Sequence, residues 1–180
     1  TNGSTKLIYT PTANHNVLKI FNGECFVIYK EGNALSKQVK IEQKGTTQAG
    51  GSVACLGIDA LIQFGCDPIF LIGQDCALTS DRYYSKHSRF NQQLFSQISG
   101  SAQLNKLHQR KFQTKKPVKI KSTYGNEIIT DQLMYNYLRN LEEITMQNKN
   151  TRIYNLCSQG AVIDGTHALY SISELKRWFL

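Results

Sequence analysis

The sequence contains few prolines, few tryptophans and few charged residues. Its 180 residues include 3 prolines and 1 tryptophan, and only 19% are charged. With 41% hydrophobic residues, the composition is globular and excludes a disordered chain. No apolar run reaches the roughly 18 residues that a membrane span needs, and the first six residues lack the apolar core of a signal peptide. We therefore expect a cytoplasmic protein without a transmembrane segment.

The length fits one domain, which we expect to span residues 1–180. Residue 180 falls only a few residues into a predicted helix. We therefore expect the chain to be a fragment of a longer protein.

Metal-ligand spacing is also missing. The five cysteines are far apart, and the four histidines have no partner at a ligand spacing. We predict no metal site and expect the cysteines to be reduced thiols, with Cys55, Cys66 and Cys76 unpaired.

Charge of one sign is in excess, with a formal net charge of +8. Such a balance favours anionic partners. Much of it lies between Lys106 and Lys121, where Phe112 is the only aromatic residue among the lysines and arginines. Binding of single-stranded nucleic acid uses aromatic side chains between the basic ones, so we predict no nucleic-acid partner.

The pattern of elements predicts an α/β fold. We expect a strand at 6–9, a hairpin of 17–21 with 25–29 around Asn22-Gly23, a helix at 52–64 and a strand at 69–72. A second hairpin at 118–121 and 127–129, a helix from Asp131 capped by Thr130, a strand at 152–156 and a helix from Ser171 follow. The unbroken apolar run Ile69–Ile72 is typical of a central parallel strand. These elements predict a mostly parallel sheet with helices on both faces.

Two segments could hold a ligand at one edge of this sheet. Gly50-Gly51-Ser52 stands at a helix start, where free N–H groups attract anions, although the same residues also suit a plain turn and cap. Gly73-Gln74-Asp75 follows the strand, where α/β sheets bind ligands, although Asp75 could instead cap a turn. The helix runs antiparallel to the strand, so we expect both segments to open onto one pocket.

A third segment, Asn155 to Gly165, follows the predicted strand at 152–156. Asn155 ends that strand, and Gly160 and Gly165 permit a close approach of the backbone. The segment suits either a ligand site or a turn.

These motifs together resemble the central domain of bacterial motility accessory factors, which are flagellin glycosylation proteins. The family also includes the MptE-like 6-hydroxymethylpterin diphosphokinases. The resemblance covers about residues 40–175 in outline. It is carried by Gly50-Gly51-Ser52-Val53-Ala54, Leu61, Gly65, Pro68-Ile69, Gly73-Gln74-Asp75-Cys76-Ala77-Leu78-Thr79, Thr130-Asp131, Tyr135, Tyr154-Asn155-Leu156, Gly160-Ala161, Ile163 and Gly165.

The resemblance implies a Rossmann-like fold similar to bacterial sialyltransferases. It also implies transfer of a nonulosonic or sialic acid type of sugar from a CMP donor to flagellin or another protein or glycan acceptor, with no cofactor required. The MptE-like branch implies instead a diphosphokinase that uses ATP and magnesium. A non-catalytic module that binds flagellin or a glycan is the third alternative.

On this reading, Gly50, Gly51 and Ser52 would bind the donor phosphate. Gly73, Gln74 and Asp75 would face the nucleoside or the sugar, and Asn155 and Gly160 would line the opposite wall. Asp75 and His87 are both candidates for the catalytic base, because a general base needs a carboxylate or imidazole within reach of the acceptor.

Overall fold

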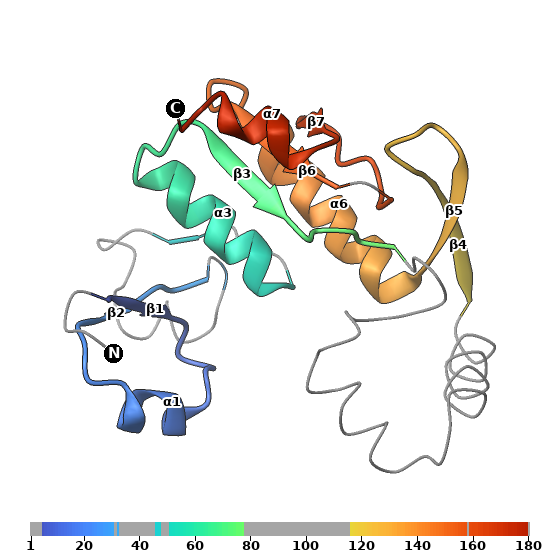
Figure 1. Cartoon of the computed structure of the whole chain (residues 1–180). Coiled ribbons are helices and arrows are strands. Elements are labelled where there is room, and N and C mark those ends of the chain that lie inside the picture. Colours follow the sequence, from blue (N-terminus) through green and yellow to red (C-terminus); the bar gives the residue numbers. More distant parts are fainter. Residues whose placement is uncertain are drawn as a thin grey trace, which may run out of the picture. The chain divides into compact units, whose positions relative to one another are not determined.

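The computed structural model describes residues 5–30, 32, 46–47, 51–77, 116–157 and 159–179 (Figure 1). The chain divides into two compact units, Thr1–Ala60 and Leu61–Leu180, and each is described by itself. The single-domain assignment therefore stays a prediction. No helix in the described ranges is long and apolar enough to cross a membrane.

The first unit begins with a small parallel pair of strands. Strands β1 (Leu7–Tyr9) and β2 (Cys25–Val27) pair in register, with helix α1 (His15–Ile20) between them in the chain. The predicted strand near 6–9 is confirmed, but the hairpin of 17–21 with 25–29 is wrong. The Asn14 side chain accepts the Asn16 N–H and caps α1, so the residues before Asn22 are helical.

Helix α3 (Val53–Gln63) matches the predicted helix at 52–64. Gly65 ends it with a φ of 74° and donates its N–H to the Ile62 carbonyl at 2.9 Å. The buried side chains are Cys55, Ile58, Asp59 and Ala60. The sequence spacing predicts that Val53, Gly57, Ala60, Leu61 and Phe64 share the buried face, but only Ala60 of these is buried, and Val53 is 84% and Phe64 65% exposed. That choice of face is wrong because the helix is apolar nearly all round, so periodicity could not select one side.

A three-stranded parallel sheet forms the centre of the second unit. Its order is β3 (Ile69–Ile72), β6 (Ile153–Leu156) and β7 (His167–Leu169). Among the described strands β6 is therefore central and β3 lies at an edge, so the prediction of a central strand at Ile69–Ile72 is wrong. Ile69 and Leu71 are buried, whereas Ile72 is exposed. The apolar run predicts that the strand is largely buried, but it does not predict which strands pair with it on either side.

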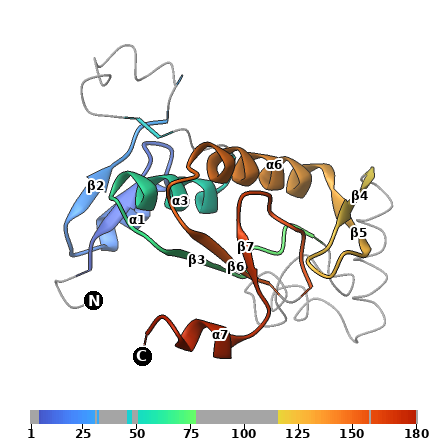
Figure 2. The same ribbon diagram turned by 90° about the horizontal axis from the view of Figure 1, so that it is seen from above.

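Helices lie on both faces of this sheet, as predicted. Helix α6 (Gln132–Gln147) lies on one side and the short helix α7 (Ile172–Lys176) on the other (Figure 2). The core on the α6 side contains Leu138, Leu141 and Ile144 from the helix, and Ile153 from the sheet. Asp131, rather than the predicted Thr130, is the N-cap of α6 and accepts the Met134 N–H at 2.8 Å. The chain is thus a mixed α/β protein with parallel sheets and helices.

The predicted second hairpin is confirmed. Strands β4 (Pro117–Lys121) and β5 (Glu127–Asp131) pair antiparallel, and β5 leads directly into α6. Beyond β4 the backbone bridges to the segment after β6, through Ser122 and Ala161. The hairpin therefore reaches the carboxyl edge of the three-stranded sheet, where the predicted ligand-binding residues of the second unit lie.

Candidate functional site

The site in the second unit is built where two adjacent strands end. Ile72 of β3 pairs with Leu156 of β6, and both strands run in the same direction. Gly73-Gln74-Asp75 and the segment from Cys157 to Ala161 therefore leave the sheet at the same edge. Ligands of α/β sheets bind beyond these carboxyl ends.

Asp75 joins the two segments. Its backbone carbonyl accepts the Ala161 N–H at 2.8 Å, and its side-chain Oδ1 accepts a hydrogen bond from the Cys157 thiol at 3.2 Å. No described residue donates a hydrogen bond to the other oxygen, Oδ2. Asp75 is half-buried, so its side chain is partly open to its surroundings.

Gly160 is required by the close approach of these segments. A Cβ atom at this position would lie 2.3 Å from Cys157 Sγ and 2.7 Å from the Asp75 Cα. The prediction that Gly160 permits a close backbone approach is confirmed. Its Cα faces the Asp75 backbone, so its contribution to the site is to allow this packing.

The β4–β5 hairpin completes the junction through two threonines. The sequence did not single out Thr123, and it predicted Thr130 only as a helix cap. The Thr123 N–H donates to the Gly160 carbonyl at 3.0 Å, and its hydroxyl to the Cys157 carbonyl at 3.3 Å. The Thr130 hydroxyl donates to the Cys76 carbonyl at 2.8 Å. Cys76 has a φ of 47°, a conformation uncommon for residues other than glycine. Threonines in hairpins are too common to have signalled these contacts.

Asn155 lies below this edge, on the central strand. It is 1% exposed, and neither its Nδ2 nor its Oδ1 has a hydrogen-bond partner within the described ranges. It is thus inside the unit and does not form an open wall, which differs from the predicted position. A buried amide without partners costs about 1–3 kcal/mol per group, and most buried polar groups in proteins are paired. This exception is two residues from Cys157.

Gly51 and Ser52, in the first unit, form the start of α3. Gly51 has a φ of 63°, and the Ser52 Oγ accepts the Cys55 N–H at 3.2 Å. Ser52 is therefore a helix cap, the alternative that the sequence left open. Their binding of a phosphate, and a pocket shared with Asp75, stay predictions. Gly50 and His87 lie outside the described residues.

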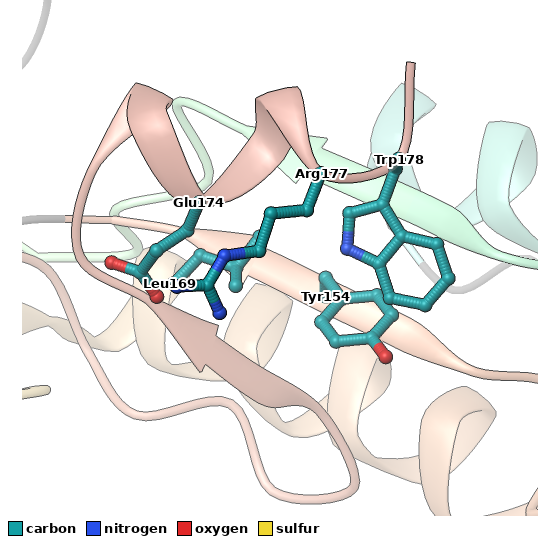
Figure 3. A pocket seen from close by; sticks show the side chains of 5 residues that line it. All are labelled: Tyr154, Leu169, Glu174, Arg177 and Trp178. Atoms are coloured by element: carbon teal, nitrogen blue, oxygen red, sulfur yellow. The ribbon is translucent and has the colours of Figure 1, made fainter. Parts of the chain in front are cut away.

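A cavity of about 330 Å³ lies on the α7 side of the sheet (Figure 3). It is lined by Tyr154, Leu169, Glu174, Arg177 and Trp178. The rings of Tyr154 and Trp178 are 5.1 Å apart, and the Arg152 guanidinium lies 5.3 Å from the Trp178 ring centroid. These contacts attach the end of α7 to the sheet.

Metal-binding and cysteine chemistry are simple in the described part of the chain. It contains no group of three or more His, Cys, Asp or Glu side chains that could hold a metal ion. All five cysteines are free thiols, which confirms the prediction for Cys55, Cys66 and Cys76. Burial, and then the hydrogen bond to Asp75, raise the pKa of the Cys157 thiol, so it is the neutral donor near pH 7.

Fold and site together define a class: an α/β protein with polar side chains at the carboxyl ends of adjacent parallel strands, where this class binds its ligands. Residues 1–81 match the family model described as 6-hydroxymethylpterin diphosphokinase MptE-like, which confirms the resemblance to that family. The matched part includes Gly50-Gly51-Ser52 and Gly73-Gln74-Asp75. No curated protein and no solved structure significantly matches the chain.

Proposed function

We propose that the chain is a Rossmann-like, nucleotide-sugar-dependent glycosyltransferase domain. Its donor would be a CMP-linked sugar of the nonulosonic or sialic acid type, and its acceptor flagellin or another protein or glycan. The observation that carries the proposal is the half-buried Asp75 at the end of β3, with Oδ1 held by Cys157. Carboxylates in such positions accept hydrogen bonds from ribose or sugar hydroxyls.

The net charge of +8 supports an anionic donor. In the transfer, the acceptor hydroxyl oxygen would bond to the anomeric carbon while that carbon's bond to the phosphate oxygen breaks and CMP leaves. A base takes the hydroxyl proton, and Asp75 and His87 are the two candidates. Gln74, beside Asp75, would contribute amide hydrogen bonds to the same ligand.

The match of residues 1–81 favours a second candidate, a diphosphokinase acting on a pterin alcohol with ATP. Magnesium in phosphate-transfer sites is commonly held by one or two carboxylates together with the substrate phosphates. The Oδ2 of Asp75, to which no described residue donates, would suit such a ligand. In this function Asp75 would bind the metal ion, which supplies charge stabilisation for the transferred phosphates.

Calorimetry separates these functions. CMP should bind the wild-type protein without added metal, and Asp75→Asn should weaken it only in part, because the amide keeps one acceptor. Binding of ATP that depends on magnesium and is abolished by Asp75→Asn would instead establish the diphosphokinase. Binding of neither nucleotide would favour the non-catalytic module. Glu127→Gln, an exposed carboxylate on β5 that pairs with Lys119, is the matched control.

A further inference from the structure

Among the described residues, one side-chain hydrogen bond joins Gly73-Gln74-Asp75 to the segment from Cys157 to Ala161, and the Cys157 thiol makes it. It donates to Asp75 Oδ1 at 3.2 Å and accepts the Gly160 N–H at 3.0 Å. The side chain is 3% exposed, so water does not compete effectively for these bonds. The thiol therefore has one donor and one acceptor role, and both are filled.

Both the backbone and the side chain of Cys157 have hydrogen-bond partners among the described residues. Its carbonyl accepts the Thr123 hydroxyl, and Gly160 leaves no room for a Cβ atom between Sγ and the Asp75 backbone. The backbone of Asp75 is itself tied to Ala161 at 2.8 Å. The two hydrogen bonds of the sulfur, to Asp75 Oδ1 and from the Gly160 N–H, hold the Cys157 side chain toward Asp75.

The consequence is an asymmetric carboxylate. Oδ1 is directed into the junction by the thiol, and Oδ2 is left for a partner outside the described protein atoms. Without a donor at position 157, the carboxyl group would rotate about its Cβ–Cγ bond, because a terminal sp³–sp² torsion is broad. A ligand would then have to order the carboxylate as it binds.

We propose that Cys157 is a positioning residue that orients Asp75 for its ligand. The inference rests on the proposed function, because it takes Asp75 to be a ligand-binding residue. Cys157 acts through Asp75 and does not touch the substrate. The sulfur chemistry is not needed: any small donor in this place should serve.

The test compares Cys157→Ala, which removes the donor, with Cys157→Ser, which keeps one. CMP affinity is measured by NMR titration to millimolar concentration, with the fold checked by circular dichroism. We expect Cys157→Ala to weaken CMP binding about five- to tenfold, because the ligand must then order the Asp75 carboxyl group as it binds. Cys157→Ser should remain within about threefold of wild type. Cys66→Ala, at a half-buried thiol outside the site, should leave affinity unchanged.

A double-mutant cycle distinguishes positioning from a general effect on the fold. If Cys157 acts through Asp75, Cys157→Ala should cost no affinity in an Asp75→Ala background. An equal loss in both backgrounds, unaltered affinity in Cys157→Ala, or a serine variant as weak as the alanine variant would each overturn the proposal.

The proposed function can fail separately. If wild type binds neither CMP nor ATP with magnesium, the function is wrong, and the same cycle is then measured by urea unfolding. Coupling between Cys157→Ala and Asp75→Ala in stability would still support the holding of Asp75 by the thiol. Independent effects on unfolding would overturn that as well.

Discussion

At the residue scale, Gly160 leaves no room for a side chain. Gly160→Ala places a Cβ atom 2.7 Å from the Asp75 Cα and against the Cys157 sulfur. The contact with Asp75 needs backbone movement and the sulfur must also shift, so we expect a loss of about 1–3 kcal/mol in the free energy of unfolding, the usual cost of overpacking. Gly57→Ala is the control: its Cβ meets nothing within 4 Å inside α3, and it should stabilise by about 0.5–1 kcal/mol. Equal effects of the two substitutions in urea unfolding would refute this account of Gly160.

A substitution at Asn155, in contrast, should raise stability. Its amide is buried without described partners, so Asn155→Leu, similar in volume, removes an uncompensated desolvation cost. We expect the variant to melt at a higher temperature than wild type. A lower melting temperature would show that the amide is satisfied in solution, for example by a buried water molecule.

Helix capping and phosphate binding by Ser52 can be distinguished by measuring unfolding and CMP affinity separately. Ser52→Ala removes the acceptor for the Cys55 N–H, and loss of a helix cap costs about 0.5–2 kcal/mol in unfolding. If Ser52 also binds a phosphate, CMP affinity should fall by about 0.5–1.5 kcal/mol. Ser52→Asp keeps the cap and adds negative charge, so it should fold normally and bind CMP worse than the alanine variant. Unchanged affinity in both variants would leave Ser52 as a cap alone.

The sequence predicted which segments meet at the edge of the sheet better than the contacts between them. Asp75 and Gly160 each follow a predicted strand, and the rule for parallel sheets places strand ends at one edge. The contacts of Cys157, Thr123 and Thr130 depend on segments up to 82 residues apart meeting in space. No local sequence pattern predicts such long-range contacts, and a cysteine among apolar residues predicts only a buried thiol.

At the scale of elements, the sequence predicted where helices and strands occur better than which strands pair with each other. Helices α3 and α6, strand β3 and the β4–β5 hairpin are where their patterns indicated. The failures are instructive. Asn22-Gly23 suggested a hairpin, but the segment before it, His15–Ile20, is a helix that Asn14 caps. The apolar run in β3 is an edge strand among those described, since strand order is a property of the whole sheet.

Helix α6 carries a buried carboxylate that should give the unfolding free energy a pH dependence. Glu142 is 4% exposed; its Oε1 accepts the Asp164 N–H at 3.3 Å, and its Oε2 pairs with Arg139 at 2.5 Å. Burial is the main influence, and it raises the pKa of Glu142 above its ordinary 4.5. A folded-state pKa above the unfolded value gives stability that is fully present below about pH 4.5 and is lost as pH rises through the folded pKa.

Glu142→Gln removes this titration while keeping an acceptor for Asp164. We therefore expect the variant to gain on wild type in melting temperature as pH rises from 4.5 to 7.5. Glu143→Gln, on the exposed side of the same helix, should show no such trend. A constant difference between Glu142→Gln and wild type across this range would contradict the prediction. The lost pair with Arg139, which is half exposed, contributes only about 0–1 kcal/mol.

At the scale of the whole molecule, free thiols are distributed over both compact units. Cys25 is exposed in the first unit, whereas Cys55 of that unit and Cys157 of the second are buried. Burial also raises the pKa of both buried thiols. Because the thiolate is the reactive form, low exposure and a high pKa act in the same direction.

We therefore predict that iodoacetamide at pH 8 modifies Cys25 rapidly in the native protein and leaves Cys55 and Cys157 protected. Peptide mass spectrometry resolves the sites. In urea, the labelling of Cys55 reports opening of residues 1–60, and that of Cys157 reports opening of residues 61–180. One common urea midpoint for the two sites would mean that the units unfold as one cooperative body, and two midpoints would mean that each has its own stability. Rapid native labelling of Cys157 would contradict its burial against Asp75, and with it the contact on which the orientation of that carboxylate depends.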